Sequence, residues 1–193
     1  MARTAKLSRQ TKETNVEVEL CLDGGEIEIF TGVHFFDHML QAFAVHSGFG
    51  IKIKATGDLD VDFHHTVEDV GIVLGQVFED ALGDKKGITR YAHVYIPMDE
   101  ALLFAAVDIC GRSYLVFDGH FPQEKVGRFD TCLIREFMRA FVMHAGITLH
   151  LRCEEGENAH HMIEGLFKAL AHVLYDGSRV TRGKQLLSSK GSL

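Results

Sequence analysis

Two pairs of adjacent histidines, each followed by a glutamate, are the residues of this sequence best suited to chemistry. The two motifs are His64-His65-Thr66-Val67-Glu68 and His160-His161-Met162-Ile163-Glu164. Each opens an amphipathic run of helical period, so its first histidine and its glutamate, four residues apart, share one helix face. The adjacent histidine points about 100° away from that face. The first histidine and the glutamate of one turn can therefore bind the same divalent ion. The second imidazole cannot bind that ion as well, and the simplest interpretation is that it binds a second one.

A solvated first turn, whose glutamates favour the helix N-terminus, is the alternative for one such motif. Two copies of the motif at matching helix starts argue against this alternative.

The spacing of other residues repeats as well. Glu13 lies 11 residues before Gly24. Glu100 lies 11 residues before Gly111. A repeat this long indicates a duplicated domain and not a solenoid.

The alternation of apolar and polar residues predicts the elements that must position the histidines. Residues 14–30 predict a hairpin that turns at Asp23-Gly24-Gly25. Further strands are expected at residues 51–54, 91–96, 101–109 and 147–151, and helices at 35–46, 64–83, 129–144 and from 160 onward.

This order of elements predicts an α+β fold built by internal duplication. Each half is expected to be a small, mostly antiparallel sheet with two helices packed on one face. We assign the first repeat to residues 1–88 and the second, with a C-terminal substrate-binding tail, to residues 89–193. No linker rich in proline or serine separates them, so one compact unit is expected.

Composition narrows the class of protein. Hydrophobic residues make up 46% of the 193 residues and charged residues 24%, which is ordinary for a globular domain. The net charge of -7 disfavours nucleic-acid binding through a basic surface. No apolar run is long enough to span a membrane, and the N-terminus lacks a signal sequence. Four scattered cysteines suggest reduced thiols, so the cytoplasm is the expected location.

The repeat assigns four candidate metal ligands to each half, enough for two sites with open positions for substrate or water. Imidazole and carboxylate ligands suit manganese, iron or zinc. Cationic residues on loops and helix ends, together with hydroxyls in the tail, are candidate phosphate ligands. The candidate metal ligands are His38, His64, His65, Glu68, Glu136, His160, His161 and Glu164; the candidate phosphate ligands are Arg90, Arg112, Lys168, Ser188, Ser189 and Lys190.

Five motifs in the chain resemble those of the imidazoleglycerol-phosphate dehydratase family of histidine biosynthesis. They are Phe36–Leu40, Asp62–Asp69, Pro97–Leu102, Gly156–His161 and Ser188–Gly191. The resemblance implies a manganese enzyme with two ions per active site, assembled as a 24-subunit cage with active sites shared between subunits. It also implies a reaction in which imidazole glycerol phosphate loses water and becomes imidazole acetol phosphate.

The family's functional positions fall on the candidates above. The eight metal positions match, with Glu136 where some members carry histidine, and a carboxylate can still bind manganese. The phosphate positions match as well, and Glu13 matches an acidic substrate contact. A glutamine that some members carry is Ala42 here, with Gln41 one position earlier.

This chemistry needs a base, because the proton to be removed lies on a carbon that is not acidic. Ions on the ring nitrogens would act as Lewis acids and help the ring expel the hydroxyl. Loss of the neighbouring C–H proton then gives an enol that tautomerises to the ketone. Glu13 is the candidate base, and a metal-bound carboxylate, Glu68 or Glu164, or a metal-bound hydroxide is its competitor.

A histidine-rich metal-binding or storage protein without catalysis is the alternative from another class. Carboxylate storage sites of the ferritin type need long four-helix bundles, and this chain has strands between its helices. Turnover of the phosphate ester would distinguish an enzyme from a storage protein.

Overall fold

The described residues form two four-stranded sheets and four long helices, in the same order in each half apart from two short strands added in the second. The computed structural model describes residues 2–181, 183, 185–189 and 191. The first half contains β1 (Thr4–Gln10), β2 (Thr14–Cys21), β3 (Ile27–Phe30), α1 (His34–Ser47), β4 (Gly50–Gly57) and α2 (His64–Leu82). The second contains β5 (Tyr91–Met98), β6 (Ala101–Asp108), β7 (Tyr114–Asp118), β8 (Lys125–Val126), β9 (Phe129–Asp130), α3 (Leu133–Ala145), β10 (Thr148–Glu155) and α4 (Ala159–Ser178).

The two sheets have the same topology. Their strand orders are β1-β2-β4-β3 and β5-β6-β10-β7, and β8 pairs with β9 in a small separate ribbon. All neighbours in the two sheets are antiparallel except the edge pairs β3–β4 and β7–β10, which are parallel. The expected α+β duplication, with mostly antiparallel sheets, is confirmed. The boundary between residues 88 and 89 stays a prediction.

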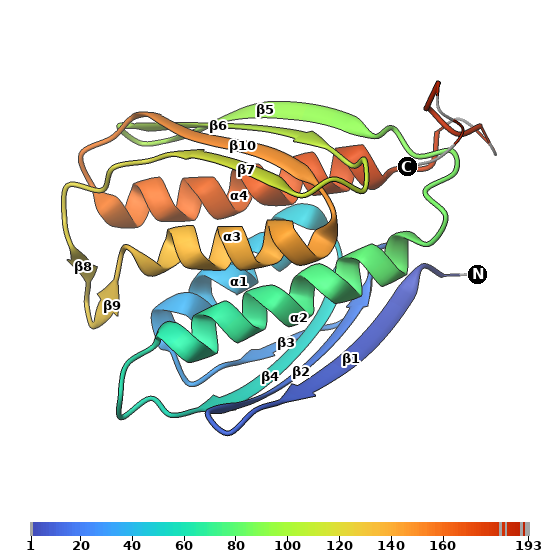
Figure 1. The fold of residues 1–193 in the computed structure, drawn as a ribbon. Coiled ribbons are helices and arrows are strands. Elements are labelled where there is room, and N and C mark those ends of the chain that lie inside the picture. The colour runs from blue at the N-terminus through green and yellow to red at the C-terminus, as the bar shows by residue number, and fades with distance from the viewer. Residues whose placement is uncertain (1, 182, 184, 190, 192–193) are drawn as a thin grey trace.

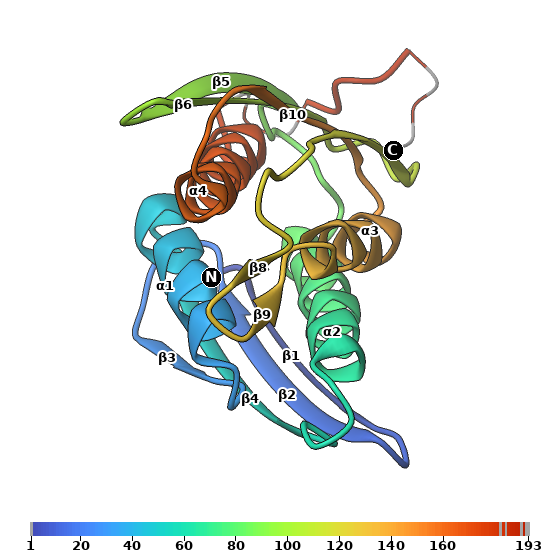
Figure 2. The same cartoon turned by 90° about the vertical axis from the view of Figure 1, so that its left-hand side faces the viewer.

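The four helices form a layer between the two sheets (Figure 1). They pack in two pairs, α1 with α4 and α2 with α3, so each pair joins the two halves (Figure 2). Helices α2 and α3 approach closely because glycines line α2: a Cβ at Gly75 would lie 2.5 Å from the carbonyl oxygen of Phe141 on α3. Each sheet turns its apolar rows inward, as Val16, Val18 and Leu20 do on β2, and together these rows and the helices make one core.

All four helices begin at the same end of this layer. Strands β3 and β4 run parallel and lead into α1 and α2, so both helices start at one edge of the first sheet. The parallel strands β7 and β10 lead towards α3 and α4 in the same way. Figure 1 shows the helix starts of both halves at its left, with the described C-terminal segment at its right. Residues at helix N-termini are therefore brought together.

Two of the expected elements are wrong, and some strands were not expected. Residues 14–30 do not form a hairpin, because β4 lies between β2 and β3. The sequence pattern missed β1 and β7, so Glu13 lies in the turn between β1 and β2 and not ahead of the first strand. The helix expected at 129–144 begins at Leu133, after β9. No helix in the described ranges is both long and apolar enough to cross a membrane.

Candidate functional site

Each histidine pair lies on the first turn of a long helix, where a polar side chain just before the helix binds the backbone N–H of the first histidine. The Asp62 side chain accepts a hydrogen bond from the backbone N–H of His64 (2.7 Å), and the Asn158 side chain accepts one from that of His160 (2.9 Å). Such bonds satisfy N–H groups that the helix leaves unpaired, and at α4 the acceptor Asn158 is the N-cap residue itself. The two rings in each pair are turned apart, with interplanar angles of 85° and 76°. Adjacent histidines therefore face different partners.

The closest gathering of ligand atoms joins the two halves through α1 and α4. The Nε2 atoms of His38 and His160 lie 3.4 and 3.3 Å from the same carboxylate oxygen of Glu164. Within the described part of the chain, these three residues form the one group whose His, Cys or acidic ligand atoms all lie within 4.8 Å of one another. Two imidazoles and one carboxylate are a donor set that suits manganese, iron or zinc.

Lys168 holds Glu164 in its charged form. Its ammonium group lies 2.8 Å from the other carboxylate oxygen of Glu164, one helical turn away. Burial raises the pKa of Glu164, but the hydrogen bond and charge of Lys168, together with His38, outweigh it and leave that pKa below its ordinary value. A deprotonated carboxylate is the form that binds a metal ion.

The second histidine of the first pair is held by a carboxylate that we had not singled out. The Nδ1 atom of His65 lies 3.0 Å from Asp58, which follows β4, and 3.9 Å from Glu13. The hydrogen bond to Asp58 raises the pKa of His65, against the effect of burial. A carboxylate on one ring nitrogen orients an imidazole so that its other nitrogen is presented as a ligand. The signal in the sequence was only an aspartate at a strand end.

The equivalent histidine of the second half is held by a different residue. The Nδ1 atom of His161 lies 2.8 Å from Glu100, which also accepts hydrogen bonds from the backbone N–H groups of Glu157 and Asn158. The hydrogen bond from His161, followed by that from Asn158, lowers the pKa of Glu100 to about 2. Glu100 is the counterpart of Glu13 in the repeat, but here it is tied to the histidine.

The remaining expected ligands are less closely grouped. His64 and Glu68 share a helix face as expected, with 3.7 Å between Nε2 and a carboxylate oxygen. Glu136 lies on the first turn of α3, 4.0 Å from Arg139. Within one chain, Glu136 does not join His64 and Glu68 in a close group of the kind that His38 forms with His160.

Among the described residues, the expected phosphate ligands other than Lys168 lie at the opposite end of the molecule. The backbone N–H of Arg90 donates to the carbonyl of Gly177, near the end of α4. From His160 to Gly177 the helix extends roughly 26 Å at its usual rise. The Arg90 side chain pairs with Asp108 (2.7 Å) and donates to the carbonyl of Leu187, which fixes the described tail at this end.

Arg112 and the two serines of the tail are the other expected phosphate ligands that the structure describes. Arg112 is exposed, 4.0 Å from Asp108. Ser188 and Ser189 come directly after the anchored Leu187, and Lys190 lies outside the described residues. Apart from Lys168, the described phosphate candidates of one chain are therefore separated from its expected metal ligands by the length of a helix.

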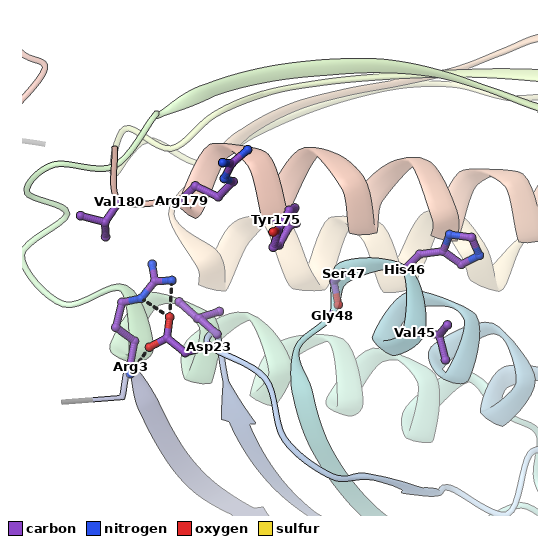
Figure 3. Close-up of a pocket in the computed structure, with 10 residues that line it drawn as sticks. Arg3, Asp23, Val45, His46, Ser47, Gly48, Tyr175, Arg179 and Val180 are labelled. Atoms are coloured by element: carbon purple, nitrogen blue, oxygen red, sulfur yellow. Dashed lines mark hydrogen bonds and ion pairs between the residues drawn. The ribbon is translucent and has the colours of Figure 1, made fainter. Parts of the chain in front are cut away.

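Pockets lie at both ends. One, of about 690 Å³, is lined by residues that include Glu100, Asn158, His160 and His161. Another, of about 760 Å³, lies between the ends of α1 and α4, where Arg3 is held by Asp23 and Arg179 lies on the opposite wall (Figure 3). None of our expected site residues lines this second pocket. It belongs to the end of the molecule that carries the expected phosphate ligands.

Comparison with known proteins gives a consistent result over the whole chain. Residues 31–174 match the model of the family described as imidazoleglycerol-phosphate dehydratase. The proteins of that name from Clostridium acetobutylicum and Caldicellulosiruptor saccharolyticus are 52% and 51% identical, over 99% and 100% of this chain and 98% and 99% of theirs. The crystal structure of the Staphylococcus aureus enzyme has a TM-score of 0.84 at 41% identity, covering 93% of this chain and 99% of that one. The Pyrococcus furiosus enzyme, in complex with (S)-C348, has a TM-score of 0.84 at 35% identity, covering 97% and 100%.

Proposed function

Because the chain belongs to the imidazoleglycerol-phosphate dehydratase family, we propose that it removes water from imidazole glycerol phosphate to give imidazole acetol phosphate, a step of histidine biosynthesis. The observation that carries this proposal is the meeting of His38, His160 and Glu164 beside Lys168. A storage protein needs ligands alone, whereas a cation fixed beside them suits the binding of a phosphate ester.

We propose two manganese ions per active site, held by ligands from the N-terminal ends of the four helices. The cluster of His38, His160 and Glu164 supports one of them, because its donor set and close spacing fit such an ion. The remaining candidates, His64, His65, Glu68, Glu136 and His161, provide the rest. Bound there, the ions supply Lewis acidity to the substrate's imidazole ring.

The active site is shared between chains. The histidine motif of α4 and the phosphate ligand Arg90 of one chain lie roughly 26 Å apart along α4, by the rise of an α-helix. A small phosphate ester cannot span that distance, so Arg90, Arg112 and the serines of one copy meet the histidine end of another. Lys168, beside Glu164, belongs to the histidine end. Repetition of this contact gives a closed homo-oligomer, for which we propose 24 subunits.

Within this site the chain's own residues bind, orient and move a proton. The arginines and Lys168 hold the phosphate, which places the imidazole ring among the histidines. Glu13 takes the C–H proton. Its carboxylate lies near His65 but is not needed to hold that ring, because Asp58 does so. Four unpaired cysteines suit the cytoplasm, the compartment that we propose.

A direct assay tests the activity. Purified protein, supplied with manganese and imidazole glycerol phosphate, should form the ketone of imidazole acetol phosphate. Protein that binds manganese but leaves the phosphate ester unchanged would be a metal-binding protein of the storage class.

Asp58→Asn should weaken metal binding without unfolding the chain. The amide cannot accept the Nδ1–H hydrogen bond of His65 as strongly, and loss of such a partner typically costs about 10–100-fold in metal affinity. Titration calorimetry of metal-free protein with manganese measures this change. Asp60→Asn, in the same loop, is the matched control and should bind as the wild type does. Equal affinities for the two variants would show that Asp58 does not position His65.

A further inference from the structure

A buried carboxylate directly follows the first histidine motif, and the proposed metal site does not use it. Asp69 comes after the expected ligand Glu68 on α2 and is 7% exposed. One of its carboxylate oxygens accepts a hydrogen bond from the hydroxyl of Thr14 on β2, and the other accepts one from Nε of Arg9 on β1 (3.2 Å). Asp69 therefore joins the helix of the histidine motif to the two strands that flank Glu13.

A chain of hydrogen bonds leads from Asp69 to the backbone of Glu13. The carboxylate of Asp69, paired with Arg9, only accepts, so the hydroxyl of Thr14 gives its one proton to it. The hydroxyl of Thr11 lies 3.2 Å from that of Thr14 and must donate to it. The Thr11 oxygen in turn accepts from the backbone N–H groups of Glu13 (3.1 Å) and Thr14 (2.9 Å). The direction of every bond in this chain is set by the carboxylate at its end.

The other backbone group of Glu13 is fixed as well. Its carbonyl accepts a hydrogen bond from the backbone N–H of Asp58 (3.1 Å), the residue whose side chain holds His65. The N–H and the C=O of Glu13 are thus tied to the turn on one side and to the end of β4 on the other. These two bonds determine from which point the side chain reaches towards the histidine.

The second repeat has apolar or small residues in the same places. The residues equivalent to Arg9, Thr14 and Asp69 are Ile96, Ala101 and Gly165. A Cβ at Gly165 would overlap the side chain of Leu103, so β6 packs directly on α4 there. The fold therefore closes without polar residues at these positions. Since a buried charge is costly even when it is paired, its presence in the first repeat calls for a role beyond packing.

The two equivalent glutamates differ in the way that this role requires. Glu100 is fixed by its own carboxylate, which binds His161 and two backbone N–H groups. Among the described residues, the carboxylate of Glu13 makes one longer contact, 3.9 Å to His65, and its side chain is 56% exposed. The place of Glu13 is therefore set through its backbone, and its carboxylate stays available to accept a proton.

We propose that Asp69 is a positioning residue for Glu13 and acts through the hydroxyls of Thr14 and Thr11. A base must lie within hydrogen-bond reach of the proton that it removes, and a displacement of about 1 Å can lower a rate about 10²-fold. By fixing the turn between β1 and β2 against α2, Asp69 keeps Glu13 beside the first histidine motif. This inference rests on the proposed reaction and on Glu13 as its base.

Thr14→Val tests the chain of hydrogen bonds, because it removes the hydroxyl and leaves Asp69 and the neighbouring ligand Glu68 in place. Its kcat should fall about 10–100-fold through misplacement of the base, while KM and manganese content stay at wild-type levels. Thr14→Ser keeps the hydroxyl and is the matched control, and it should retain the wild-type kcat. Steady-state kinetics and elemental analysis of the assembled protein give these values.

A double-mutant cycle shows whether the effect passes through Glu13. Added to Glu13→Gln, Thr14→Val should lower kcat no further, because there is then no base left to misplace. An equal loss in both backgrounds, or a Thr14→Val enzyme with lowered manganese content, would indicate a general structural role and overturn the inference. Asp69→Asn provides the same cycle if Thr14→Val does not assemble.

The same measurements separate this inference from the proposed function. An active wild type whose Thr14→Val and Asp69→Asn variants both keep the wild-type kcat would overturn the role of Asp69 alone. A wild type that forms no ketone would overturn the proposed reaction, and the positioning of its base with it.

Discussion

Glu13→Gln should reduce kcat by roughly 10²–10⁴, the range for loss of a positioned acid or base, while metal content and assembly stay at wild-type levels. Glu13 is exposed in the turn between β1 and β2. Its carboxylate lies 3.9 Å from His65, whereas Asp58 makes the hydrogen bond to that ring. The amide keeps the size of the side chain but cannot accept the proton.

Glu100→Gln is the matched control, because Glu100 has the same place in the second repeat. Its carboxylate is occupied by His161 and two backbone N–H groups. This variant should lose metal affinity first, and its kcat at saturating manganese should fall far less. Elemental analysis together with steady-state kinetics separates the two effects. A Glu13→Gln enzyme with near wild-type kcat would show that the base is a metal-bound group.

Glu164→Gln should remove the ion held at the cluster of α1 and α4, and nearly all activity with it. Glu164 meets His38 and His160 through one oxygen and Lys168 through the other. Lewis-acid stabilisation of several kcal/mol corresponds to roughly 10³-fold or more in rate. Metal content should fall from two ions per chain towards one.

Asp176→Asn is the control for this second variant. Asp176 lies on the same helix, half exposed, 3.7 Å from Arg179, and should keep both ions and full activity. A Glu164→Gln protein that retained two ions per chain after dialysis would contradict the assignment of Glu164 as a ligand.

The repeat, the helices and the donor types could be predicted because they depend on local pattern. Two histidine motifs with helical spacing fixed the starts of α2 and α4, and the positions of β2, β4, β5, β6 and β10 followed from alternation, whereas β1 and β7 were missed. The pairing of strands could not be predicted in the same way. Residues 14–30 contain a turn signal between two alternating runs, yet β4 inserts between them, because the parallel pair β3–β4 forms across a helix connection.

The sequence also could not predict which candidate ligands lie close together in the structure. His38 and Glu164 are in different halves, and only the packing of α1 on α4 brings them together. Asp58 was missed because an aspartate at a strand end looks like an ordinary loop residue. The separation of Arg90 from the histidines appears only when the direction of α4 is known. Local pattern therefore identifies candidate groups, and tertiary packing decides which of them meet.

A complementation experiment tests most directly whether this dehydratase builds its active site from two chains. His160→Ala removes a ligand at one end of the chain, and Arg112→Glu reverses a phosphate ligand at the other. The two inactive proteins are stripped with a chelator, mixed and reassembled with manganese. We expect ketone formation from imidazole glycerol phosphate to reappear, because some sites then combine an intact histidine end with an intact arginine end. A mixture of His160→Ala with a chain that carries both substitutions should stay inactive, and an equally inactive first mixture would contradict a shared site.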